Sequence, residues 1–94
     1  MFNIGLDIGT SFVKVALTDI NSGKVIDLIS YPEKEQAIIS IKNGWAEQDP
    51  DVWWQNSCEA IRLLINRNNI NPINIKGVGV SYQMHGLVMV DSSG

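Results

Sequence analysis

Apolar and polar positions alternate along residues 2–8 and 13–18, and residues 25–31 form a third stretch rich in Ile and Val. In the first stretch every even-numbered position is apolar, whereas the odd-numbered positions between them carry Asn, Gly and Asp. A period of two is the pattern of a β-strand that buries one face. Turn-forming residues separate the stretches at positions 9–11 and 19–23. The pattern predicts a three-stranded antiparallel meander.

Residues 50–67 carry the longer period of an amphipathic helix. Asp49 is a suitable N-cap, and Pro50 suits the first helical position. Trp53 and Trp54 are expected to be aromatic anchors of this capped helix. Apolar residues recur at a helical spacing that we expect to face the sheet, with the cysteine among them a buried and inert thiol: Trp54, Cys58, Ile61, Leu64 and Ile65.

Residues 75–82 are interpreted as a buried strand, with Gly77 and Gly79 on one face and valines on the other. Residues 83–86 interrupt it, and residues 87–90 predict a last short strand. A helix that crosses from the third strand to the next strand favours parallel pairing of that later strand. The expected fold class is therefore α/β, with β-β-β-α-β order in a mixed sheet.

The tip between the first two strands carries the strongest chemical signal, because Asp7 precedes a glycine and two hydroxyls, Thr10 and Ser11. Such a tip can turn backbone N–H groups toward an anion, and Gly9 is free to take a positive φ there. The hydroxyls and Lys14 can add contacts to phosphate, and Asp7 can hold a hydrated Mg²⁺ nearby. Neither a Walker A loop nor a Rossmann fingerprint is present. Ordinary turn chemistry accounts for the same residues equally simply.

Two further motifs carry polar or aromatic groups at expected element ends. Residues 44–50 read Gly-Trp-Ala-Glu-Gln-Asp-Pro, and Trp45 precedes the helix cap, where it either walls a ligand cleft or belongs to a simple capped helix. Residues 83–86 read Gln-Met-His-Gly at the end of a strand, where α/β proteins place polar ligand groups. A lone His85 is also a common structural hydrogen-bonding residue.

The composition is that of an ordinary globular chain of 94 residues, with 45% hydrophobic and 18% charged residues. A net charge of −3 argues against a nucleic-acid partner or an anionic membrane surface. The single cysteine excludes an intrachain disulfide, and the start of the chain lacks the pattern of a signal peptide, so we expect a cytoplasmic location. The chain stops in a turn-forming cluster, residues 91–94, so we expect it to be a fragment.

Taken in order, the three motifs resemble the N-terminus of the FGGY family of carbohydrate kinases, and the resemblance covers residues 2–91. It rests on residues 4–11 with Lys14, on residues 44–50 and on residues 83–86. It implies a ribonuclease-H-like, actin-type ATPase fold, in which two domains close around ATP and a sugar. The Gln-Met-His-Gly form is most similar to that of the xylulokinase group, which implies D-xylulose as the sugar.

The resemblance also implies roles for single residues. Asp7 would lie near Mg²⁺ and the γ-phosphate of ATP, and the nucleotide phosphates would contact the tip of the first hairpin: Gly9, Thr10, Ser11 and Lys14. The ketose would lie beside Gln83, Met84 and His85, with Trp45 nearby. The family's catalytic base is an aspartate much later in the chain. Residues 1–94 would therefore be the N-terminal part of the first domain, inactive alone.

Three alternatives stay open at this level. One is an FGGY kinase for another ketose or a sugar acid. Another is a non-catalytic nucleotide-binding or assembly module of the actin-like group, and the third is a purely structural domain. Unpaired sheet edges would also favour self-association, so we include a homodimer among the expected states.

Overall fold

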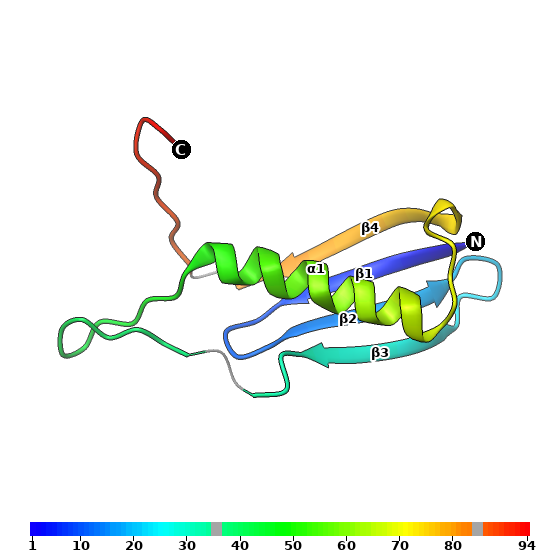
Figure 1. Cartoon of the computed structure of the whole chain (residues 1–94), viewed down its shortest axis with the longest axis horizontal. Helices are drawn as coiled ribbons and strands as arrows, with labels where there is room; N and C mark the ends of the chain where they lie inside the picture. Colours follow the sequence, from blue (N-terminus) through cyan, green and yellow to red (C-terminus); the bar gives the residue numbers. More distant parts are fainter. Residues whose placement is uncertain (35–36, 84–85) are drawn as a thin grey trace.

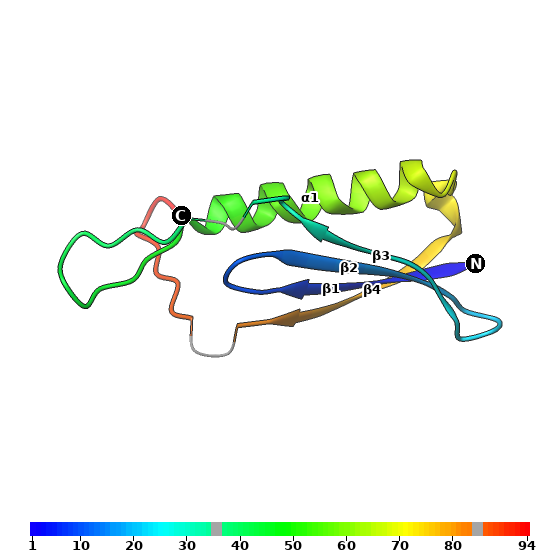
Figure 2. The same ribbon diagram turned by 90° about the horizontal axis from the view of Figure 1, so that it is seen from below.

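A computed structural model describes residues 1–34, 37–83 and 86–94. The element order is β1 (Phe2–Ile8), β2 (Val13–Asp19), β3 (Val25–Tyr31), α1 (Pro50–Arg67), the short 3-10 helix η1 (Pro72–Asn74) and β4 (Ile75–Tyr82). The four strands form one sheet in the order β3-β2-β1-β4, and α1 packs against one face of it (Figures 1 and 2). The predicted α/β class and β-β-β-α-β order are confirmed.

The sheet is mixed because β1 pairs antiparallel with β2 and parallel with β4. In the chain, α1 follows β3 and precedes β4, and it runs back along the sheet (Figure 1). Strand β4 can therefore lie beside β1 and run in the same direction. The register places Asp7 of β1 between Lys14 of β2 and Ser81 of β4. The parallel pairing expected from the sequence is therefore confirmed.

The core lies between the sheet and α1, and it follows the alternation of the strands. Its buried apolar side chains come from β1, β2 and α1: Ile4, Val13, Val15, Leu17, Ala60 and Leu64. Asp7 and Lys14 are exposed because they occupy the opposite face of their strands. The helix thus covers one face of the sheet and leaves the charged face open (Figure 2).

The helix begins as predicted and buries part of the expected stripe. The Asp49 side chain accepts a hydrogen bond from the Asp51 N–H at 3.0 Å, as an N-cap does. The buried positions are Ser57, Ala60 and Leu64, whereas Trp54 is 72% exposed. Leu64 of the expected stripe is buried, and Ile61 and Ile65 pack against the core as expected, whereas the Trp54 anchor is wrong.

Small side chains occupy two of the three buried positions of α1, so the centre of the buried stripe lies beside the expected one. Ser57 can be buried because its hydroxyl donates to the Trp53 carbonyl at 2.7 Å, which satisfies its polar group. Cys58 is half-buried rather than buried, because it lies beside this stripe instead of in its centre.

Strand β4 is exposed, contrary to the expected buried strand. Val78 is 54% exposed and Val80 is 58% exposed, because α1 lies over β2 and β3 and does not reach this edge of the sheet. The last short strand expected at residues 87–90 is also wrong. Residues 86–90 have no regular structure, and Leu87 is 84% exposed, since no strand among the described residues pairs with this stretch.

The C-terminal end of α1 is tied to β3 by a bidentate ion pair. Arg67 donates from Nε to Asp27 Oδ2 at 2.8 Å and from Nη2 to Oδ1 at 2.6 Å. Asn68 adds a third hydrogen bond, from Nδ2 to Asp27 Oδ2 at 2.7 Å. Hydrogen bonds from Arg67 and then from Asn68 hold the pKa of Asp27 well below its usual range.

Within residues 1–34, 37–83 and 86–94, no helix combines the length and the apolar character needed to cross a membrane.

Candidate functional site

The turn between β1 and β2, residues 9–12, is called the hairpin tip here. It is closed by a hydrogen bond from the Gly9 N–H to the Phe12 carbonyl at 3.0 Å. Gly9 is not among the glycines with a positive φ in the described residues, so the turn does not use the left-handed conformation that is open to glycine. Glycine is needed for another reason. A Cβ at this position would lie 3.0 Å from the Phe12 carbonyl oxygen, which is too close for an unstrained contact.

Two side-chain amides hold the backbone carbonyls of the hairpin tip. Gln48 donates from Nε2 to the Thr10 carbonyl at 2.6 Å, and Gln83 donates from Nε2 to the Gly9 carbonyl at 3.4 Å. The Thr10 hydroxyl donates to Gln83 Oε1 at 3.1 Å. Gln48 follows the loop before α1 and Gln83 follows β4, so the three sequence motifs meet at the hairpin tip.

The open face of the sheet beside the hairpin tip carries one acid and one base. Asp7 and Lys14 are direct cross-strand partners, and both are exposed. A shallow cavity of about 530 Å³ lies on this face, and its floor and rim come from β1, β2, β3 and β4: Gly5, Leu6, Asp7, Lys14, Ala16, Leu28, Gly79, Val80 and Ser81. Small residues in the floor leave room for a ligand above the strands.

No group of three or more His, Cys, Asp or Glu side chains that could hold a metal ion occurs in the described ranges. One exposed carboxylate, that of Asp7, suits a Mg²⁺ ion whose other ligands are water and phosphate oxygens, because Mg²⁺ keeps most of its water in such sites. The residues present therefore fit a metal that arrives with a phosphate ligand.

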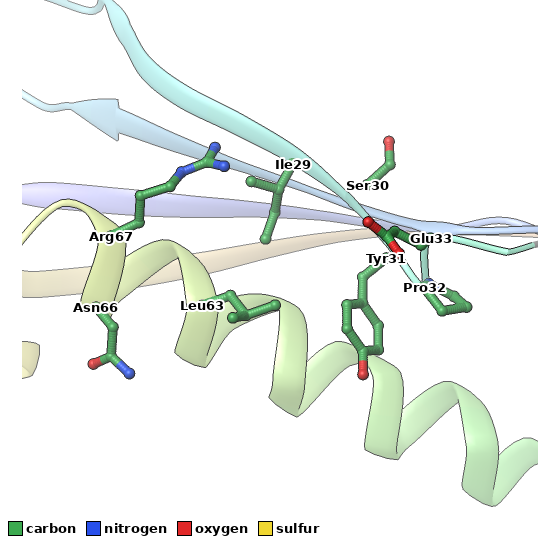
Figure 3. Close-up of a pocket in the computed structure, with 8 residues that line it drawn as sticks. All are labelled: Ile29, Ser30, Tyr31, Pro32, Glu33, Leu63, Asn66 and Arg67. Carbon is green, nitrogen blue, oxygen red and sulfur yellow. The ribbon is translucent and has the colours of Figure 1, made fainter.

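A larger cavity of about 740 Å³ lies between β3 and α1 and contains none of the candidate site residues. Figure 3 shows Ile29 and Tyr31 extending from the strand toward the helix, while Ser30 points away. Apolar side chains dominate its lining: Ile29, Tyr31, Pro32 and Leu63, with Ser30, Glu33, Asn66 and Arg67 at its margins. The chemistry and the motifs both favour the smaller cavity as the candidate site.

The remaining candidates are only partly brought together. Ser11 lies half-buried in the hairpin tip. Trp45 is 51% exposed on a loop that extends beyond the end of the sheet, residues 40–47 in Figure 1, and Lys42 Nζ lies 4.8 Å from its ring centroid. The structure therefore does not bring Trp45 to the hairpin tip. Met84 and His85, expected beside the sugar, lie outside the described residues.

Gln48 and Trp53 are the site residues that the sequence reasoning missed. The Trp53 indole N–H donates to Gln48 Oε1 at 3.0 Å, so both side chains belong to the support of the hairpin tip. Gln48 belongs to the second motif, but no role was predicted for it. Trp53 was expected only to anchor the helix. The available signal was the position of Gln48, a polar amide directly before the N-cap of a helix.

Comparison with known proteins agrees with this arrangement. Residues 2–94 match the model of the N-terminal domain of the FGGY family of carbohydrate kinases. The xylulose kinase of Bacillus subtilis is 42% identical over 88 residues, which cover 94% of this chain and 17% of that protein. A xyloylose kinase structure from Brucella ovis superimposes with a TM-score of 0.85 at 32% identity, covering 99% of this chain and 19% of that one.

A gluconate kinase structure from Lactobacillus acidophilus gives a TM-score of 0.74 at 36% identity over 89% of this chain and 16% of that one. The chain thus spans less than a fifth of the length of the relatives described here. The structural neighbours are sugar kinases of the actin-like ATPase fold, which confirms the expected fold class. The family model covers nearly every residue, and the three motifs converge on one hairpin. The chain therefore belongs to the FGGY family of carbohydrate kinases.

Proposed function

We propose that the chain is the N-terminal part of the first domain of a xylulokinase. The whole protein would transfer the γ-phosphoryl group of ATP to D-xylulose and release ADP and D-xylulose 5-phosphate. The observation that carries this proposal is the convergence of the three motifs on the hairpin tip, through Gln48 and Gln83. Similarity to named xylulose kinases supports the choice of sugar.

The nucleotide side of the proposed site consists of the hairpin tip and the open face beside it. Phosphoryl transfer requires positioned phosphates and a cation that neutralises developing charge. Thr10 and Ser11 of the tip, with the Lys14 ammonium, are proposed to contact the phosphates. Asp7 is proposed to hold Mg²⁺ through water. When bound, the metal would supply charge neutralisation at the phosphate oxygens.

The base that accepts the sugar hydroxyl's proton is proposed to lie in another part of the protein. Asp49 is a poor candidate because its carboxylate already caps α1, accepting from the Asp51 N–H. General-base help is commonly worth about 10²–10⁴-fold in rate. We therefore expect the 94-residue chain alone to form no sugar phosphate.

The sugar side of the proposed site follows β4. Met84 can cover the apolar face of a sugar, His85 can donate and accept hydrogen bonds, and Gly86 allows close backbone approach. Trp45 would reach this side only if its loop approached the substrate in the whole protein. A half-buried unpaired thiol, Cys58, accords with a reducing cytoplasmic setting, which we include in the proposal.

The experiment is a substrate profile of the complete protein. ADP release is measured with Mg·ATP and with D-xylulose, L-xylulose or D-gluconate, and sugar phosphate is identified by mass spectrometry. We expect D-xylulose to give the highest kcat/KM. Gluconate is the most informative alternative substrate, because a gluconate kinase is among the structural neighbours. A higher kcat/KM for gluconate would show that the substrate is a sugar acid and not the proposed ketose.

The same assay separates the kinase from a non-catalytic nucleotide-binding module. Such a module would bind Mg·ATP but release ADP at a rate independent of sugar. A purely structural domain would bind no Mg·ATP. Either result would contradict the proposed function.

A further inference from the structure

Two side-chain amides hold backbone carbonyls of the hairpin tip, and one of them, that of Gln48, has no role in the proposed catalysis. We propose that Gln48, oriented by Trp53, is a positioning residue that fixes the hairpin tip for nucleotide phosphates. The inference rests on the proposed function, because it assumes that phosphates bind at this tip. Gln48 acts through the Thr10 backbone rather than by touching a substrate.

The first step of the argument is the rigidity of the peptide group. The carbonyl of one residue and the N–H of the next lie in one plane and point in opposite directions in a trans peptide. Gln48 Nε2 holds the Thr10 carbonyl at 2.6 Å, so it fixes the direction of the Thr10–Ser11 peptide plane. Gln83 Nε2 holds the Gly9 carbonyl in the same way, at 3.4 Å. The orientation of the tip as an anion-binding turn is therefore set from its carbonyl side.

The second step is the orientation of the Gln48 amide. An indole N–H can only donate, so the hydrogen bond from Trp53 Nε1 at 3.0 Å requires the oxygen end of the amide to face Trp53. The nitrogen end must then face the Thr10 carbonyl. Trp53 is half-buried in the first turn of α1, and its own carbonyl accepts from the buried Ser57 hydroxyl at 2.7 Å. The helix that packs on the sheet thus fixes the amide, and the amide fixes the tip.

The third step separates the effect of Gln48 from that of the sugar motif. Gln83 directly precedes Met84 and His85, so a change at Gln83 disturbs both sides of the proposed site. Gln48 forms hydrogen bonds with the Thr10 carbonyl and the Trp53 indole, and it lies in the loop before α1 rather than in residues 83–86. A change at Gln48 should therefore weaken nucleotide binding and leave use of the sugar nearly unchanged.

The experiment compares Gln48→Met, Gln48→Glu and Trp53→Phe in the complete protein, with Gln55→Met as the matched control. Gln55 is an exposed glutamine on α1, so the control makes the same chemical change away from the tip. The measurements are the Kd of Mg·ADP by calorimetry, the KM values of ATP and D-xylulose, and the melting temperature.

We expect Gln48→Met to raise the Kd of Mg·ADP and the KM of ATP about 2- to 13-fold, the range for one lost hydrogen bond, with the D-xylulose KM within about twofold. Gln48→Glu should weaken nucleotide binding further, because it places a carboxylate against the Thr10 carbonyl. Trp53→Phe should have a smaller effect, since it only frees the amide to turn. Gln55→Met should match the wild type.

Unchanged nucleotide affinity in Gln48→Met would overturn the inference. So would equal losses for both substrates together with a lowered melting temperature, because this is what a purely structural role produces. If the wild type binds Mg·ADP but phosphorylates no sugar, the proposed function fails, and the Kd comparison still tests the inference. If the wild type binds no nucleotide, both are overturned.

Discussion

Asp7 lies on the exposed face of β1, outside the buried cluster that holds the sheet to α1. We predict that Asp7→Asn in the complete protein lowers kcat on the order of 10²-fold, because it removes a charge near the proposed metal while keeping the side chain's shape. The melting temperature should stay within about 2 °C of the wild type, since no core contact is lost. Steady-state kinetics and calorimetry check both values.

Asp51→Asn, which changes another exposed acid of the chain, serves as the control for this prediction and should keep full turnover. Turnover of Asp7→Asn within a few-fold of the wild type would contradict the metal role.

His85 is predicted to act on the sugar side of the site. His85→Ala should raise the KM of D-xylulose about 2- to 13-fold, the range for one hydrogen bond to an uncharged group, and leave the KM of ATP nearly unchanged. Kinetics for both substrates and a melting curve test this. An effect confined to ATP, or one accounted for by unfolding, would show that the residue does not contact the sugar.

At the scale of single elements, the four strands of the sheet were predictable, whereas the short strand expected at residues 87–90 is absent and the packed face of the helix was predicted only in part. Apolar and polar residues alternate in β1 and β2 because α1 buries one face of each strand. This period of two can be recognised in the sequence alone. The helix buries Ser57 and Ala60, which a search for large apolar residues passes over. Burial there depends on how closely the helix approaches the sheet, and this distance is a property of the assembled fold.

The motifs of the candidate site were predictable, but the hydrogen bonds that join them were not. The chemistry of residues 7–14 pointed to phosphate, and the order of the three motifs pointed to one family. The bond between Thr10 and Gln83 depends on the parallel register of β1 and β4, which no local pattern encodes. The role of Gln48 likewise depends on where the first turn of α1 lies relative to the hairpin tip.

The ion pair between Arg67 and Asp27 is predicted to make the docking of α1 on β3 dependent on pH. Hydrogen bonds from Arg67 lower the pKa of Asp27, so the folded state favours the charged carboxylate. This stabilisation is fully present above the unfolded pKa of Asp, about 3.9, and is lost as the pH falls below it toward the lower folded value.

Asp27→Asn should therefore lower the melting temperature of the complete protein at pH 7, and its difference from the wild type should shrink as the pH falls below about 4. Asp51→Asn, which changes an exposed acid in the first turn of α1, is the comparison variant. A difference between Asp27→Asn and the wild type that stays constant from pH 7 to pH 3 would contradict the assignment.

At the scale of the whole molecule, apolar side chains remain exposed along β4, and both outer strands of the sheet, β3 and β4, have one unpaired edge among the described residues. Such edges template pairing with another chain. We predict that the 94-residue chain self-associates at high concentration, and that Val78→Lys reduces this by placing a charge on β4. Light scattering across a concentration series measures it.

Ser93→Lys adds the same charge on the exposed stretch after β4 and should leave the self-association unchanged. A strictly monomeric wild-type chain at high concentration would contradict the prediction, as would equal effects of the two lysine variants.

The parallel pairing of β4 with β1 has a consequence for the order of events during synthesis. Gly9 and Gln83 are 74 residues apart in the chain although their groups meet. The β1–β2–β3 meander needs only the first 31 residues, whereas the bond between Thr10 and Gln83 must wait for the helix and the strand that follow it. Closing so long a loop costs entropy that short hairpins avoid. During synthesis the β1–β2–β3 meander would therefore form before its turn is held by Gln83. The proposed nucleotide site would be completed later, when β4 pairs with β1.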